Sequence, residues 1–183
     1  MKNTKLNNII LCSLFTAFLC ISSFIIIPTS VPFTLQTLII FTGVGLLKLK
    51  YGLLFVLVYI ALGFIGMPVF AGLNSGFGAL FNASGGFILG FIPLALIEGL
   101  FIIKKRSKKN LFLGMFFGLL ACYLVGCIWY SFISLGFFNI KTFITSFSIC
   151  VAPFILPDIV KIFCAIFLIT RLEKYFLAKN SKN

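Results

Sequence analysis

Hydrophobic residues fill six long segments of this chain, and polar residues gather in the short stretches between them. Several segments approach the roughly 20 residues that a helix needs to cross the apolar core of a bilayer. Runs such as "LLFVLVYIALGFIG" (53–66) do not alternate between apolar and polar residues, so the pattern of a membrane β-barrel is excluded. The pattern predicts an all-α, polytopic membrane protein with one domain over 1–183. Its six predicted transmembrane helices run roughly over 7–27, 35–47, 51–66, 85–103, 111–135 and 157–177.

Composition and charge agree with this class. Hydrophobic residues make up 61% of the 183 residues. A soluble domain could not keep so many hydrophobic residues away from water. A net charge of +12 raises the possibility of nucleic-acid binding. However, the basic residues stand in short patches between apolar segments, which is typical of the cytoplasmic loops of membrane proteins. We therefore expect contact with the lipid bilayer of the cell membrane and none with nucleic acid.

The basic patches alternate with uncharged linkers along the chain. The linkers 28–34, 67–84 and 136–156 hold one basic residue, Lys141. Because positively charged loops stay in the cytoplasm, both termini are predicted to be cytoplasmic. The opposite linkers are rich in Pro, Gly and Phe, and we expect them to fold back over the bundle as caps. The patches on the cytoplasmic side consist of Lys2, Lys5, Lys48, Lys50, Lys104, Lys105, Arg106, Lys108, Lys109, Arg171, Lys174, Lys179 and Lys182.

Small residues recur at helical spacing in the fifth segment. Gly114, Gly118, Cys122 and Gly126 follow one another every four residues, which makes a smooth stripe for close contact between helices. We expect this stripe to pack inside the molecule.

No catalytic or metal-binding motif is found in the sequence. The six cysteines (12, 20, 122, 127, 150 and 164) form no C-x-x-C pair, and the chain has no histidine. We interpret the cysteines as small apolar fillers. There is also no Ser/His/Asp set, carboxylate dyad or phosphate-binding loop. The chain is therefore predicted not to be an enzyme, to need no metal or cofactor, and not to hydrolyse ATP by itself.

The stretch "PFILPDIVK" (153–161) places an aspartate and a lysine inside the last apolar segment. A charge at the centre of a bilayer costs roughly 2.5–3.5 kcal/mol on insertion scales, so such a residue suggests a function. Asp158 follows Pro157, which suits a first helical turn, and Lys161 lies on the same helical face. Two interpretations remain open. The pair is either an ion pair satisfied by itself or a ligand socket, in which Asp158 accepts hydrogen bonds and Lys161 neutralises an anion.

Other polar residues lie on the same predicted side of the membrane, and glycines there let a backbone approach a ligand closely. Together with an acid, a base and several aromatic rings they favour a small-molecule pocket. These candidates are Thr34, Gln36, Asn74, Ser75, Asn82, Ser84, Gly85, Gly86, Phe33, Phe70, Phe77 and Phe87. Glu98 differs, because it lies shortly before "KKRSKK" (104–109). We expect Glu98 to be structural and to pair with those lysines.

Three motifs together resemble the BioY family, the biotin-binding S components of energy-coupling-factor (ECF) vitamin transporters. They are "VPFTLQTL" (31–38), "GMPVFAGLNSGFGALFNASGG" (66–86) and "PFILPDIVK" (153–161). The resemblance covers nearly the whole chain. It implies an S-component-like bundle that captures biotin from the outer side. It also implies a transmembrane coupling protein and two ABC-type ATPases as partners, whose ATP hydrolysis drives uptake.

The resemblance also implies roles for individual residues. The family's biotin contacts fall on Asn74, Asp158 and Lys161, while Thr34 and Gln36 lie over or beside the ligand. Asp158 and Asn74 would read the ureido edge of biotin. Lys161 would meet its carboxylate or orient Asp158, and the sequence leaves both open.

A further match and a departure from the family pattern concern other parts of the chain. Ser13 and Ala17 match the small-residue face of the first helix that contacts the coupling protein.

Where the family usually reads G-P-S/T-G-G-Y, this chain reads "NASGGF" (82–87), which includes Gly85 and Phe87. Some members then carry an arginine, and this chain has Ile88. This departure removes a possible second cation, so the predicted role of Lys161 in binding biotin becomes more important.

Two other functions stay open at this point. The altered "NASGGF" loop is compatible with an S component for a different vitamin. An ion-coupled small-molecule carrier, in which Asp158 titrates, is a hypothesis from another class. A lone carboxylate beside a lysine makes a poor proton relay, which argues against the carrier.

Overall fold

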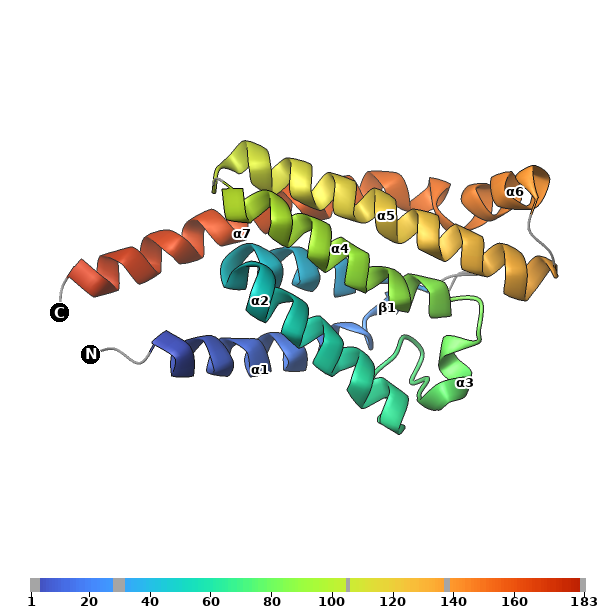
Figure 1. Ribbon diagram of the computed structural model, residues 1–183, viewed down its shortest axis with the longest axis horizontal. Helices are drawn as coiled ribbons and strands as arrows, with labels where there is room; N and C mark the ends of the chain where they lie inside the picture. The colour runs from blue at the N-terminus through green and yellow to red at the C-terminus, as the bar shows by residue number, and fades with distance from the viewer. Residues whose placement is uncertain (1–3, 28–31, 105, 137–138, 182–183) are drawn as a thin grey trace.

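The computed structural model describes residues 4–27, 32–104, 106–136 and 139–181, which form an elongated helical bundle (Figure 1). Two short strands, β1 (Ile26–Ile27) and β2 (Phe33–Thr34), pair antiparallel after the first helix. Five spans within these residues are long and apolar enough to cross a membrane. The predicted all-α membrane bundle is confirmed. Its helices are α1 (Thr4–Ser22), α2 (Gln36–Ile65), α3 (Gly76–Leu80), α4 (Gly85–Lys104), α5 (Lys108–Leu135), α6 (Ile140–Cys150) and α7 (Ile155–Ser181), with a 3-10 turn η1 (Ala152–Phe154).

The helix α2 is broken at Lys48, whose φ of 62° and ψ of −173° are not helical. The predicted segments 35–47 and 51–66 are the two halves of α2, joined at this break. A Cβ atom on Gly52 would lie 3.0 Å from the Cα atom of Val44, so the two halves pack directly against each other. Arg106 donates a 2.7 Å hydrogen bond to the carbonyl of Gly45, one of the last carbonyls before the break.

The first helix ends earlier than predicted. Helix α1 stops at Ser22, whereas the apolar segment was expected to be helical to residue 27. The hydroxyl groups of Ser22 and Ser23 donate to the carbonyls of Leu19 and Cys20, at 2.8 and 2.7 Å. Such local bonds compete with the continuing helix, and the apolar residues that follow enter β1 instead.

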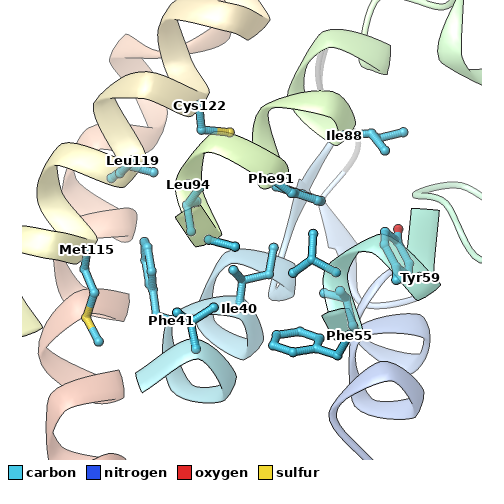
Figure 2. Packing of buried hydrophobic residues seen from close by; sticks show 14 of the residues in the cluster. Ile40, Phe41, Phe55, Tyr59, Ile88, Phe91, Leu94, Met115, Leu119 and Cys122 are labelled. Carbon is cyan, nitrogen blue, oxygen red and sulfur yellow. The ribbon is translucent and has the colours of Figure 1, made fainter. Parts of the chain in front are cut away.

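The helices α4 and α5 pack against each other along the predicted stripe of small residues. A Cβ atom on Gly118 would lie 2.8 Å from the carbonyl oxygen of Leu94, and one on Gly90 would lie 2.9 Å from the sulfur of Cys122. Figure 2 shows Leu94 of α4 between the α5 residues Leu119 and Cys122 and the buried side chains of α2. The prediction that this stripe packs inside the molecule is confirmed.

The two ends of the bundle differ in structure. Helix α1 begins and α7 ends at one end, while α3 and α6 lie at the opposite end (Figure 1). The uncharged linkers therefore carry short helices that cover this second end, in line with the expected caps. Helix α6 was not predicted from the sequence. It begins with a capping box formed by Asn139 and Thr142, and the hydroxyls of Ser131 and Ser146 join it to α5 at 2.8 Å.

Candidate functional site

A pocket lies between the segment that leads into α2, the first half of α4, α5, and the start of α7. Most of the residues that line it are apolar or aromatic, with a few polar side chains, which is the usual character of a small-molecule site. Asp158 and Lys161 are the charged residues among those described at its wall. The lining consists of Pro32, Phe33, Thr34, Gln36, Thr37, Ala71, Ser84, Phe87, Ile88, Phe91, Leu119, Cys122, Tyr123, Cys150, Phe154, Asp158 and Lys161.

Asp158 and Lys161 form a buried ion pair at the wall of this pocket. They lie in the first turns of α7, one helical turn apart, so their side chains project from the same face. Asp158 is 4% exposed and Lys161 is 6% exposed. The ammonium nitrogen of Lys161 lies 2.8 Å from the Oδ1 atom of Asp158. The structure therefore shows the ion pair of the first interpretation at the wall of a pocket, and the ligand socket of the second stays a prediction.

The ammonium group of Lys161 makes three hydrogen bonds inside the protein. Besides Asp158, it donates to the carbonyl of Thr34 at 2.7 Å and to the hydroxyl of Thr37 at 2.9 Å. It also lies 3.8 Å from the centroid of the Phe33 ring. An ammonium group has three N–H donors, so all of them are used. Lys161 thus joins the start of α2 to Asp158, and its role toward a ligand stays a prediction.

The carboxylate of Asp158 is held by three donors. Its Oδ1 atom accepts from Lys161 and from the hydroxyl of Thr37 at 3.3 Å, and its Oδ2 atom accepts from the hydroxyl of Tyr123 at 2.5 Å. A carboxylate offers about four acceptor positions, so one remains open on Oδ2. The oxygen of Tyr123 also keeps lone pairs that can accept. The charged end of the pocket is therefore prepared to receive N–H or O–H donors from a ligand.

A second hydrogen-bonded row connects the pocket to the loop after α2. The hydroxyl of Thr34 donates to the side-chain oxygen of Gln36 at 2.9 Å, and the amide of Gln36 donates to the hydroxyl of Tyr59. Tyr59 in turn donates to the carbonyl of Val69 at 3.0 Å. Thr34, Gln36 and Tyr59 are all buried. Thr34 and Gln36 therefore help to fix the loop that covers this side of the pocket.

The structure leaves seven of the candidate pocket residues outside the pocket wall: Phe70, Asn74, Ser75, Phe77, Asn82, Gly85 and Gly86. Asn74 and Gly85 are the two among them that were predicted to contact the ligand. Asn74 is exposed, and its side-chain amide donates to the carbonyl of Ala71 at 2.8 Å. Gly85 begins α4, where a Cβ atom would lie 1.7 Å from the carbonyl oxygen of Leu80, so this position needs a glycine for packing. Their roles in binding remain predictions. The predicted residues that the structure does bring to the wall are Phe33, Thr34, Gln36, Ser84, Phe87, Asp158 and Lys161.

Several residues at the wall were not predicted from the sequence. Tyr123 and Thr37 are the most important, because each bonds directly to Asp158. The rings of Phe33 and Phe154 stack at a centroid distance of 5.5 Å and an angle of 11°. A polar side chain among the apolar residues of α5 was the available signal for Tyr123. Thr37 directly follows the predicted Gln36 but was not singled out.

The cysteines are free thiols, and their positions refine the interpretation as apolar fillers. Cys12, Cys122, Cys127 and Cys150 are buried, as expected for fillers. Cys122 and Cys150 also line the pocket. Cys164 is exposed on α7, within a span long and apolar enough to cross a membrane, so for this residue the interpretation as an apolar filler stays a prediction. Among the described residues no group of three or more Cys, Asp or Glu side chains could hold a metal ion.

Glu98 makes no ion pair with the described residues of the basic stretch 104–109, contrary to the predicted pairing. Its side chain is 0% exposed, and neither carboxylate oxygen has a hydrogen-bond partner among the described residues. The reason is the orientation of α4. A Cβ atom on Gly114 of α5 would lie 3.1 Å from the Cα atom of Glu98, and Ala95 and Ile102 on the same helical face are buried too. Within the basic stretch 104–109, Arg106 forms an ion pair, and its partner is Glu173 of α7.

The residues predicted to contact a coupling protein lie on α1. Ser13 and Ala17 are exposed on the outer face of this helix. The hydroxyl of Ser13 donates to the carbonyl of Ile9 within the helix at 3.1 Å, so Ser13 presents a small surface with its polar group satisfied. The large neighbours Leu14 and Phe18 are exposed on the same helix.

Comparisons with known proteins agree with one another. The model of the BioY family matches residues 1–178. A biotin transporter of Thermotoga maritima is 32% identical over 92% of this chain and 97% of its own length. A probable biotin transporter of Pyrococcus horikoshii is 34% identical over 92% of this chain and 98% of its own. Among solved structures, the S-component for biotin from an ECF-type ABC transporter superposes with a TM-score of 0.82 at 29% identity, covering 95% of this chain and 94% of that one.

Proposed function

This chain belongs to the BioY family, and we propose that it is the biotin-capturing S component of an ECF-type ABC importer. The observation that carries this proposal is the buried carboxylate of Asp158 at the pocket wall. It is held by Lys161, Thr37 and Tyr123 and keeps an open acceptor position on Oδ2. A ligand with N–H donors completes this arrangement.

The chemistry of biotin fits the two parts of the pocket. Its ureido ring has two N–H donors, which match the Oδ2 atom of Asp158 and the oxygen of Tyr123. Its fused sulfur-containing ring is apolar and matches the aromatic part of the wall. Phe33 and Phe154 stack on each other there, and Phe87 and Phe91 lie on the wall formed by α4. The wall thus offers acceptors for the head of biotin and rings for its body.

We infer that the chain crosses the membrane six times, with both termini in the cytoplasm. The two halves of α2, on either side of the break at Lys48, would each make one crossing. Lysine and arginine residues lie at the start of α1, at the break in α2, between α4 and α5, and late in α7. Since the positive end of a bundle faces the cytoplasm, the pocket and the caps α3 and α6 would face the outside.

The energy for uptake would come from partner proteins. The chain has no phosphate-binding loop, so a transmembrane coupling protein and two ABC-type ATPases would supply ATP hydrolysis. Ser13 and Ala17 support a contact with the coupling protein, because small exposed residues on a membrane helix allow another helix to approach closely.

Binding is tested by titrating the purified protein in detergent with biotin and following the heat released. Asp158→Asn removes the charge of the acceptor, and we expect biotin affinity to fall about 100-fold, or about 2.7 kcal/mol. The matched control is Glu98→Gln, which makes the same chemical change at a buried site outside the pocket. It should leave affinity unchanged. Equal affinity of the native protein and Asp158→Asn would refute the proposed site.

A second candidate is an S component for a different vitamin. It is favoured by one observation, the "NASGGF" stretch (82–87), because Ser84 and Phe87 from this stretch line the pocket. Displacement of labelled biotin by unlabelled biotin, riboflavin and thiamine separates the two. Displacement by biotin alone supports the first proposal, and binding of another vitamin without biotin supports the second. An ion-coupled carrier fits the geometry poorly, because Asp158 is engaged by Lys161, Thr37 and Tyr123.

A further inference from the structure

The two charged residues of the pocket wall are buried, and we call the part of the pocket beside them its deep end. Asp158 and Lys161 are both buried and compensate each other, so the described wall carries no net charge. The wall residues that reach partly to the surface are uncharged, and they mark the mouth of the pocket. Apart from Thr37, which bonds to Asp158 and Lys161, they are Pro32, Phe33, Ala71, Ser84, Phe87 and Phe154. A ligand whose head is held at the deep end therefore meets no formal charge toward the mouth.

Lys161 is not available to a second anion. Its three N–H donors are used by Thr34, Thr37 and Asp158. To bind a ligand carboxylate it would have to release one of these acceptors, and a buried acceptor without a partner is unfavourable. A ligand carboxylate beside Lys161 would also approach the carboxylate of Asp158, and two like charges at that distance repel each other in a buried site.

Among the described residues that line the pocket, Lys161 is the one basic residue. Lys141 is the one basic residue in the linkers 28–34, 67–84 and 136–156 at this end of the bundle. It is exposed at the start of α6, whereas the residue of α6 that lines the pocket is Cys150, at the other end of that helix. Nine residues of α-helix span roughly 13 Å, which is longer than the five-carbon acid chain of biotin.

From these observations we propose that the pocket recognises the ureido head of biotin and leaves its carboxylate unpaired at the mouth. The ligands of this protein would then be a class defined by the bicyclic ureido head, with acidic and neutral tails bound about equally well. The proposal rests on the proposed function, because it concerns the same pocket. It assigns the selectivity of the site to Asp158 and Tyr123, and it gives Lys161 a positioning role.

The test compares three ligands on the native protein purified in detergent: biotin, biotinamide and biotin methyl ester. The last two keep the head and replace the charged tail by a neutral one. We expect the three dissociation constants to agree within about threefold. Strong binding of biotin with binding of biotinamide weaker by more than about 30-fold overturns this proposal and leaves biotin capture intact. If none of the three binds, the proposed function fails, and this proposal fails with it.

A variant of the nearest cation provides a second, independent measurement. Lys141→Gln removes the remaining positive charge of the outer linkers at an exposed position, where substitutions have little effect on folding. We expect its affinity for biotin to equal that of the native protein at both low and moderate salt. A loss of more than about tenfold at low salt would show that Lys141 pairs with the carboxylate, and would overturn the proposal.

Discussion

Asp158 and Glu98 are both buried carboxyl groups within the bundle, yet their surroundings are opposite. Asp158 is 4% exposed and accepts hydrogen bonds from Lys161, Thr37 and Tyr123 at the wall of a pocket. Glu98 is 0% exposed, packs against α5, and has no hydrogen-bond partner within the described part of the chain. Burial alone therefore does not identify a binding residue. A set of partners that fixes the group beside a cavity does.

The contrast has an energetic basis. Removing a carboxylate from water carries a penalty of several kcal/mol, which a nearby cation and hydrogen bonds offset. The three donors around Asp158 do this and also restrict where its open Oδ2 position points. Within the part of the chain that the structure describes, no such compensation surrounds Glu98, so we regard Glu98 as a cost to stability.

The largest effect is expected for Lys161→Met. This change leaves the carboxylate of Asp158 buried without its cation, and breaking a buried pair in this way costs about 3–5 kcal/mol of folding free energy. Biotin binding should be lost as well. Thermal unfolding in detergent measures the first effect and titration measures the second.

The double variant Asp158→Leu/Lys161→Met is the control for this prediction. Because it removes both charges together, we expect it to recover most of the stability but none of the binding. A double variant as unstable as the sum of the two single ones would contradict a coupled ion pair.

Glu98→Leu should raise stability. It replaces an unpartnered buried carboxyl group by an apolar side chain of similar size, and burying an unpaired polar group costs about 1–3 kcal/mol in proteins. Denaturation midpoints of the native protein, Glu98→Leu and Glu98→Gln measure the change, with the glutamine variant expected to gain little. Destabilisation by the leucine variant would mean that Glu98 has a partner or a function.

Tyr123→Phe should weaken biotin binding about tenfold, or about 1.4 kcal/mol, because Asp158 loses the 2.5 Å hydrogen bond at Oδ2. The fold should survive, since only one oxygen atom is removed. Tyr130→Phe is a matched control, because Tyr130 lies on the same helix outside the pocket wall. Equal affinity of both variants would remove Tyr123 from the account of the site.

The smallest effect is expected for Arg106→Gln, which tests the third acidic residue. Arg106 pairs with Glu173 and donates to the carbonyl of Gly45. Both charged side chains are about one-third exposed, so the ion pair itself contributes little. We expect a loss of about 1 kcal/mol, mainly from the hydrogen bond, with biotin binding unchanged. Weaker biotin binding here would show that this end of the bundle influences the pocket.

Much of the fold could be predicted from the sequence, because long apolar segments indicate helices that cross a membrane and basic patches indicate the linkers between them. The break in α2 was predicted from "KLK" (48–50), where two charges interrupt an apolar run. Helix α6 was missed because its sequence, "IKTFITSFSIC", is short and mixes polar with apolar residues. The end of α1 was placed too late, because the sequence of Phe24 to Ile27 stays apolar after the helix ends.

The candidate site was predictable only in part. Asp158 and Lys161 were found because charges are rare in an apolar segment. Tyr123 was missed because its bond to Asp158 joins residues 35 positions apart and depends on how α5 lies beside α7. The pairing of Glu98 was predicted wrongly because nearness in sequence does not fix the rotation of α4. These errors share a cause: they concern contacts between helices, which the pattern of a single helix does not determine.

The most direct test of the central claim is a crystal structure of this protein with biotin bound. We expect an N–H group of the ureido ring at about 2.7–3.2 Å from the Oδ2 atom of Asp158. The fused rings should lie among the aromatic residues, and the carboxylate should lie at the mouth with no lysine within 4 Å. Biotin bound elsewhere, or bound with its carboxylate on Lys161, would contradict the account.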